Sequence, residues 1–128
     1  MDARIRHGLL ILALVVPVGP LLAQAKDSLP EGVTAEMVAK GKKIFGGPGL
    51  CMACHGPQGK GLTGPDLTDS TWLHFDGSYQ AIVKIVLGGI DDKQSKTGVI
   101  MPPKGGSGIS DDDVKAVAAY VWSLRKRS

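Results

Sequence analysis

The stretch Cys51-Met52-Ala53-Cys54-His55 constrains the fold more than any other part of the sequence. Positions three and four apart share one face of a helical turn, so this spacing directs two sulfurs and one imidazole at a single object. Cys-x-x-Cys-His is the attachment signature for covalently bound haem, in which each thiol forms a thioether with a vinyl group. We therefore expect one haem c, attached through Cys51 and Cys54, with His55 as an axial ligand of the iron.

Other chemistries use a similar pair of cysteines. A bare Cys-x-x-Cys also occurs in dithiol oxidoreductases, in zinc sites and as a structural disulfide. Zinc needs two further ligands, and outside the motif the sequence offers only His74 and scattered acidic residues. A dithiol enzyme places the pair at the start of a helix after a strand, whereas here Gly46-Gly47-Pro48-Gly49 precedes it. A disulfide across so small a loop would constrain little of the unfolded chain. Haem attachment is therefore the favoured hypothesis.

The N-terminal region has the pattern of an export signal. Two arginines precede the apolar stretch 8–16, and Ala23-Gln24-Ala25 then fits the small-x-small pattern of a signal-peptidase site. An uncleaved anchor is disfavoured, because the unbroken apolar run is shorter than the roughly 20 residues of a spanning helix and prolines interrupt it. We expect a cleaved signal peptide at residues 1–25, a single haem domain at residues 26–128 without a membrane span, and a periplasmic location.

Composition limits the partners and the size of the core. The net charge of +3 is mild, aromatic residues make up only 5%, and no basic run is interleaved with them, which argues against nucleic acid. A small domain with 18 glycines and few large side chains buries a modest core, so it needs a bound group for stability. Haem would supply that group, and we expect the haem-free chain to be poorly folded.

Three helices are predicted from capping residues and hydrophobic spacing. The first has an N-cap at Thr34 and ends at the glycines that begin with Gly46. The second covers about 79–87 and can be capped by Asp76 or Ser78. Its β-branched residues also suit a strand, but its length, cap and terminal glycines favour a helix. The third begins after Ser110, with Asp113 completing a capping pattern. The connecting segments, including residues 90–108, are expected to be irregular.

A haem iron bound by His55 has a second axial position. Met52 lies inside the attachment motif and cannot reach across the ring, while core packing explains Met37 better. Met101 lies in a loop next to two prolines, which restrict the backbone and can hold its sulfur in place. A lone histidine such as His74 is more often a packed or partly exposed ring. We expect Met101 to be the sixth ligand, which closes the iron to substrates and raises its reduction potential relative to bis-histidine ligation.

Taken together, these residues resemble the class I c-type cytochromes over nearly all of residues 26–128. The haem motif and Met101-Pro102 carry most of the specificity. Further similarities are Gly41 and Phe45, Gly64-Pro65-Asp66-Leu67, and the stretch Ala119-Tyr120-Val121-Trp122-Ser123-Leu124. Within the family, bacterial single-haem cytochromes and the cytochrome domains of dehydrogenase and oxidase complexes are most similar.

The resemblance implies an all-α fold, with three to four helices wrapped around one haem. It implies that the first and last helices cross near Gly41 and Tyr120, where the missing Cβ allows close approach. It also implies that the carbonyl of Pro65 accepts a hydrogen bond from the free ring nitrogen of His55, which fixes the tautomer. The polar segment 90–97 departs from the family pattern, so the path of the chain to Met101 is not set by sequence.

The function that the resemblance implies is an electron carrier, not an enzyme. The partners would be redox proteins such as a dehydrogenase, an oxidase or another cytochrome, and the chain would be a monomer or a subunit of a larger complex. A freely diffusing shuttle and a cytochrome subunit of a dehydrogenase or terminal oxidase both remain open. A haem enzyme or sensor with an open sixth site ranks lower, because the sequence offers no convincing distal His and Arg pair. A thiol-disulfide oxidoreductase also ranks lower.

Overall fold

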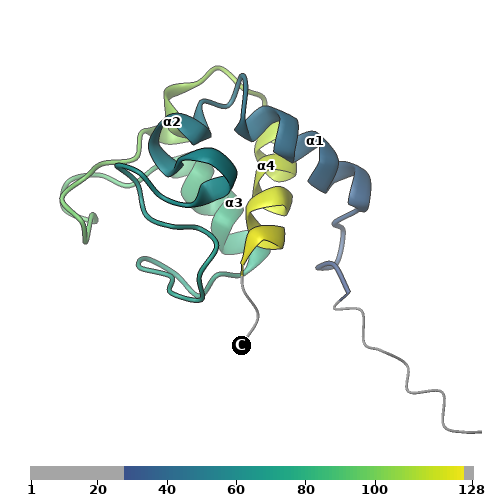
Figure 1. The fold of residues 1–128 in the computed structure, drawn as a ribbon, viewed down its shortest axis with the longest axis horizontal. Helices are drawn as coiled ribbons and strands as arrows, with labels where there is room; N and C mark the ends of the chain where they lie inside the picture. The colour runs from purple at the N-terminus through teal and green to yellow at the C-terminus, as the bar shows by residue number, and fades with distance from the viewer. Residues whose placement is uncertain (1–27, 126–128) are drawn as a thin grey trace, which may run out of the picture.

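The computed structural model describes residues 28–125, so the expected signal peptide at residues 1–25 lies outside the described part of the chain. Within that part the structure is all-α, which confirms the predicted fold class (Figure 1). Its elements are α1 (Ala35–Phe45), α2 (Cys51–His55), the 3₁₀ turn η1 (Pro57–Gly59), α3 (Tyr79–Gly88), the 3₁₀ turn η2 (Pro103–Gly106) and α4 (Asp111–Leu124). No helix among residues 28–125 has the length and apolar character needed to cross a membrane.

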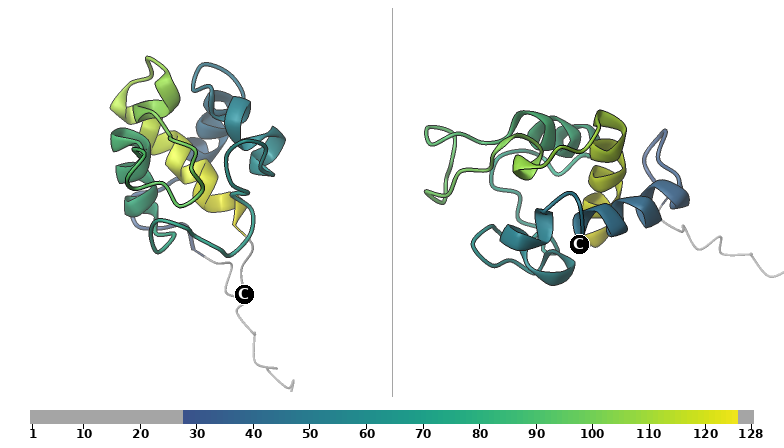
Figure 2. Two further views of the ribbon diagram at one scale, coloured as in Figure 1. Left: turned by 90° about the vertical axis from the view of Figure 1, so that its left-hand side faces the viewer. Right: turned by 90° about the horizontal axis from the view of Figure 1, so that it is seen from above.

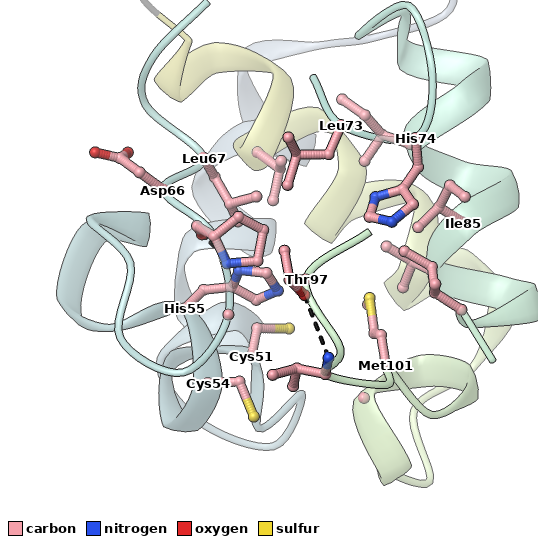
Figure 3. A pocket seen from close by; sticks show the side chains of 18 of the residues that line it. Cys51, Cys54, His55, Asp66, Leu67, Leu73, His74, Ile85, Thr97 and Met101 are labelled. Atoms are coloured by element: carbon pink, nitrogen blue, oxygen red, sulfur yellow. Dashed lines mark hydrogen bonds between the residues drawn. The ribbon is translucent and has the colours of Figure 1, made fainter. Parts of the chain in front are cut away.

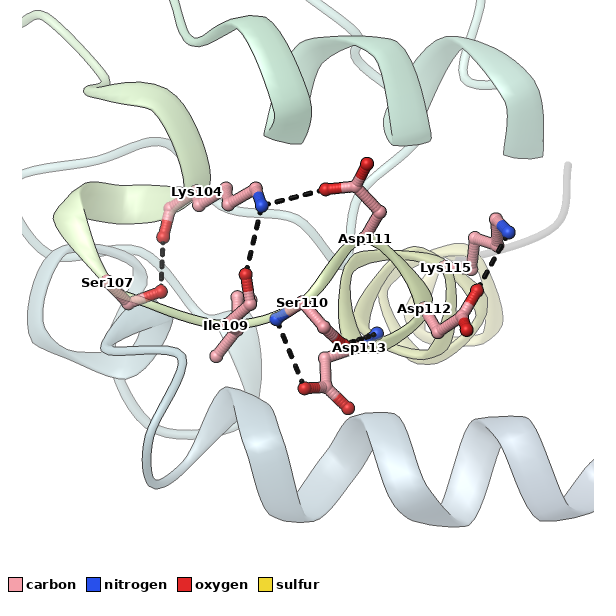
Figure 4. Close-up of polar contacts among 8 residues, drawn as sticks. All are labelled: Lys104, Ser107, Ile109, Ser110, Asp111, Asp112, Asp113 and Lys115. Carbon is pink, nitrogen blue, oxygen red and sulfur yellow. Dashed lines mark hydrogen bonds and ion pairs between the residues drawn. The ribbon is translucent and has the colours of Figure 1, made fainter.

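The three predicted helices begin at predicted caps, and of the two candidates for α3 the N-cap is Ser78 rather than Asp76. The Thr34 hydroxyl accepts a hydrogen bond from the Met37 amide at 3.2 Å, and Ser78 caps α3 in the same way. At α4 the cap is reciprocal, because Ser110 Oγ accepts from the Asp113 amide while the Asp113 carboxylate accepts from the Ser110 amide (Figure 4). Each cap satisfies backbone N–H groups that the first turn of a helix leaves unpaired.

α1 and α4 cross in close contact, and this crossing forms the frame of the domain (Figure 2). Gly41 is buried at the crossing, where a Cβ would overlap the carbonyl group of Ala116 and lie 3.0 Å from the Cβ of Tyr120. Beside it the ring of Phe45 packs edge-on against Tyr120, with 5.3 Å between centroids. The crossing that the family resemblance implies is therefore present, and only glycine permits so close an approach here.

The hydrophobic core is centred on α4. Val114, Val117 and the neighbouring small residues of this helix are almost fully buried, and α3 contributes Ile82 and Val86 to the same core. An ion pair of 2.7 Å between Lys40 and Asp113 ties the start of α4 to α1 at the surface. One side of the core opens into a pocket.

Candidate haem-binding site

One pocket brings together all five residues that the sequence predicts for cofactor binding, namely Cys51, Cys54, His55, Pro65 and Met101 (Figure 3). They lie on two segments that approach the pocket from different sides. We call residues 51–67 the cysteine–histidine wall and residues 89–104 the methionine wall. Between them, α3 and α4 supply a mostly apolar lining.

The cysteines lie on α2, which starts after Leu50 in a left-handed conformation (φ 58°). Both thiols are free: Cys51 is buried and Cys54 is exposed. Burial raises the pKa of the Cys51 thiol to about 11. Catalytic dithiols depend on a thiol whose pKa is lowered so that the thiolate forms near neutral pH. The environment of Cys51 has the opposite effect and therefore does not favour the dithiol alternative.

The loop after α2 folds back and fixes the ring of His55. His55 Nδ1 lies 3.0 Å from the carbonyl oxygen of Pro65, the contact that the resemblance implies. Because a carbonyl only accepts, Nδ1 carries the proton and Nε2 keeps its lone pair. A hydrogen bond of 2.8 Å from the Gly64 amide to the Cys54 carbonyl holds the loop in place. A Cβ at Gly64 would lie 3.0 Å from the imidazole, so the loop packs directly against the ring.

The methionine wall is more ordered than its sequence indicates. The sequence predicts an irregular segment over residues 90–108, but Ile90 and Met101 form an antiparallel bridge with N···O distances of 2.7 and 2.9 Å. The 3₁₀ turn η2 follows directly. The bridge fixes the backbone of Met101 against the end of α3, and the Met101 sulfur enters the pocket from the side opposite His55 (Figure 3). One isolated pair of residues leaves no periodic pattern in the sequence, which is why it could not be predicted.

A clamp at Lys104 closes the methionine wall at its far end (Figure 4). Lys104 has a positive φ of 55°, which an L-residue rarely adopts. Its ammonium group donates to the carbonyl of Ile109 at 3.0 Å and pairs with Asp111 at 2.7 Å. Its own carbonyl accepts from the Ser107 hydroxyl at 2.6 Å. These contacts bind the segment after Met101 to the N-terminus of α4.

The other candidate ligands occupy different positions. Met52 is 41% exposed on α2, and Met37 is half-buried on α1 without lining the pocket. His74 does line the pocket, but its Nε2 accepts a hydrogen bond from the Lys96 amide at 3.2 Å. Of the methionines in the described chain, Met101 alone reaches the pocket.

Residues that sequence reasoning did not assign to the site complete its lining. Apolar side chains from α3 and α4 belong both to the core and to the pocket, and they are Ile82, Val86, Val117 and Val121. Their helical spacing indicates a buried face, but it does not distinguish a face against protein from a face against a cofactor. Trp72 and Phe75 pack together at 5.0 Å between centroids and line another part of the pocket.

These features fit a haem group. An apolar pocket, two free thiols on one helix, and an imidazole and a thioether entering from opposite sides form a donor set typical of c-type haem. By contrast, no three His, Cys, Asp or Glu side chains within residues 28–125 gather in a way that could hold a metal ion directly. The donor set thus gives no support to the zinc alternative.

Comparison with known proteins identifies the family. Residues 36–121 match the family described as cytochrome c oxidase, cbb3-type, subunit III. The chain belongs to this family and is a cytochrome c domain. The CcoP subunit of a cbb3-type cytochrome c oxidase from Rubrivivax gelatinosus is 36% identical over 106 residues, which cover 82% of this chain and 29% of the subunit. Cytochrome c-554(548) from Halomonas halodenitrificans is 36% identical over 79 residues, which cover 59% of this chain and 84% of that protein.

Solved structures support the fold of this cytochrome c domain. Cytochrome cL from Methylophaga aminisulfidivorans superposes with a TM-score of 0.57 at 21% identity, covering 73% of this chain and 56% of that one. Cytochrome cL from Hyphomicrobium denitrificans superposes with a TM-score of 0.56 at 25% identity, covering 70% of this chain and 48% of that one. The chain spans less than a third of the length of the oxidase subunits it matches: 29% of the CcoP subunit and 27% of the FixP subunit from Bradyrhizobium diazoefficiens. Family membership implies covalent haem c and an electron carrier rather than an enzyme.

Proposed function

We propose that this cytochrome c domain transfers single electrons in the periplasm through one haem c with His55 and Met101 as axial ligands. The observation that carries the proposal is the pocket itself, into which the imidazole and the methionine sulfur enter from opposite sides of an apolar lining. When bound, haem supplies a one-electron Fe(II)/Fe(III) couple. The protein makes and breaks no bond in a substrate.

Each site residue has a defined part in this proposal. Cys51 and Cys54 hold the ring covalently. The carbonyl of Pro65 keeps the proton on Nδ1 of His55, so that Nε2 is the ligand atom and the imidazole is a stronger donor. Met101 supplies a neutral sulfur, which raises the reduction potential relative to a second histidine. The apolar lining excludes water, which limits the solvent rearrangement that accompanies a change of charge.

Two partner arrangements fit the comparisons. In the first, the domain is a free periplasmic shuttle between redox proteins such as a dehydrogenase, an oxidase or another cytochrome; the match to 84% of cytochrome c-554(548) supports it. In the second, the domain works as the cytochrome subunit of a dehydrogenase or terminal oxidase complex, which the similarity to the CcoP subunit supports. Purification from its native host separates them, because only a subunit would remain with a much larger protein.

Visible spectra of the oxidised and reduced protein, made in a host with haem-attachment machinery, test the ligands. We expect covalent haem and the weak far-red sulfur-to-iron band of methionine ligation in the oxidised native protein. Met101→Ala should lose this band and bind carbon monoxide when reduced. Met37→Ala is the matched control, because this half-buried methionine lies outside the pocket, and it should keep the band. A sulfur band that survives in Met101→Ala would contradict the proposed ligand.

The same spectra address the remaining haem alternative. A haem enzyme or sensor would have an open or labile sixth site, so carbon monoxide would shift the spectrum of the reduced native protein. With Met101 bound, the native protein should not respond, and the shift should appear only in Met101→Ala. If the native protein lacks the sulfur band and binds carbon monoxide, electron transfer through a closed site is the wrong function.

A further inference from the structure

Gly89 joins α3 to the methionine wall in a backbone conformation that is essentially restricted to glycine. Its dihedral angles are φ 72° and ψ −169°, a region that residues with a Cβ avoid. Its amide donates to the carbonyl of Ile85 at 2.7 Å and so closes the last turn of α3. The chain therefore leaves the helix at a sharp angle and enters the bridge at the next residue, Ile90.

The Met101 segment packs directly on the backbone of Gly89. A Cβ at position 89 would overlap the carbonyl oxygen of Met101, and it would lie 2.8 Å from the nitrogen of Pro103 and 3.0 Å from the carbonyl carbon of Pro102. All three of these atoms are backbone atoms, which cannot rotate away as a flexible side chain can. A side chain at position 89 would therefore displace the backbone of Met101 itself.

The methionine wall has little freedom to absorb such a displacement. The bridge to Ile90 holds Met101 on one side, with N···O distances of 2.7 and 2.9 Å. Two prolines follow, whose rings fix φ, and Lys104 binds the next turn to α4. With its ends fixed, the segment can yield only by moving away from Gly89, which carries the Met101 sulfur with it.

We propose that Gly89 is a positioning residue for the sixth ligand: the absence of a side chain at the end of α3 lets the Met101 backbone dock where its sulfur reaches the iron. This inference rests on the proposed function, since it requires Met101 to be a ligand. It assigns to Gly89 an effect on ligation that is separate from the attachment of haem, which depends on the cysteine–histidine wall.

The test uses three glycine-to-alanine variants of the full haem-bound protein. Gly89→Ala introduces both the overlap and the unfavourable φ. Gly98→Ala, in the same wall, introduces a positive φ of 77° with nothing within 4 Å of the new Cβ, so it reports backbone strain alone. Gly88→Ala also has nothing within 4 Å and has no positive φ, so it reports neither effect.

We expect Gly89→Ala to keep covalent haem and native helix content, to lose most of the oxidised sulfur-to-iron band, to bind carbon monoxide when reduced, and to have a lower reduction potential. Gly88→Ala and Gly98→Ala should retain the band. Adding Gly89→Ala to Met101→Ala should leave the potential of the single Met101 variant unchanged, because the proposed effect acts only through that sulfur.

Three results would overturn the inference. The first is a Gly89→Ala protein with the native band and potential. The second is a potential that Gly89→Ala lowers equally with and without Met101. The third is a Gly89→Ala protein that neither folds nor attaches haem where Met101→Ala does both, since Gly89 would then serve the fold rather than the ligand. If the native protein itself lacks the sulfur band, the proposed ligation fails instead, so the two failures are distinguishable.

Discussion

The two walls of the pocket are built differently. In the cysteine–histidine wall, the hydrogen bonds described above stay within residues 51–67: His55 pairs with Pro65, and the Gly64 amide with the Cys54 carbonyl. In the methionine wall, the bridge between Ile90 and Met101 is also internal, but Lys104 joins this wall to Ile109 and Asp111, which lie outside it. The hydrogen bonds that hold His55 are therefore internal to their wall, whereas the segment after Met101 is also held by the start of α4. We expect the methionine wall to be the first to loosen when the domain is perturbed.

Removal of both thiols proposed to attach haem should have the largest effect on the two walls. In Cys51→Ala/Cys54→Ala the cofactor is lost, and the apolar lining of the pocket faces water instead of filling a core. We expect a large loss of helical signal in far-ultraviolet circular dichroism. Amide hydrogen exchange should show the methionine wall losing protection first. Full native helix content in the haem-free double variant would refute both expectations.

Gly41→Ala should have the second-largest effect. It should affect both walls equally, because it acts on the crossing of α1 and α4 that supports them both. The new Cβ would overlap the backbone of Ala116, and overpacking of this kind costs about 3 kcal/mol of unfolding free energy. The control is Gly46→Ala, where the nearest atom to a new Cβ is the Lys42 carbonyl oxygen at an ordinary 3.7 Å. Denaturant unfolding of the haem-bound proteins measures the unfolding free energy of both variants. Equal values for Gly41→Ala and Gly46→Ala would show that the crossing tolerates a methyl group.

Lys104→Gln should have the smallest effect, and it should be confined to the methionine wall. Asp111 is 70% exposed in its ion pair, so most of the loss should come from the hydrogen bond to Ile109, at about 1 kcal/mol. The sulfur-to-iron band should disappear at a lower denaturant concentration than in the native protein, with the thioether bonds intact. Lys93→Gln removes an exposed lysine of the same wall. It should change neither the unfolding free energy nor the denaturant concentration at which the band disappears. A global loss of stability in Lys104→Gln, with no earlier loss of the band, would argue against a local clamp.

The same contrast explains what the sequence could and could not predict. Helix starts at Thr34, Ser78 and Ser110 could be located because a cap is a local hydrogen bond with a local signature. The attachment motif could be located for the same reason. The bridge between Ile90 and Met101 could not, since it joins two residues across a polar loop with no repeating pattern. The proposed role of Gly89 was equally hidden, because a terminal glycine looks like an ordinary helix stop until the packing of Met101 against it is known.

The two adjacent faces of α4 have a consequence for how such a domain can vary. Ala116 and Tyr120 meet α1 at the crossing, while Val117 and Val121, one position further along, line the pocket. One set of positions on α4 thus holds the two helices together, and a different set determines the electrostatic surroundings of the pocket. Substitutions at Val117 and Val121 can adjust the dielectric environment of the pocket, and with it the ease with which a bound haem iron is oxidised, while the contact between α1 and α4 stays intact. Such a separation lets one scaffold serve donors and acceptors of very different redox strength.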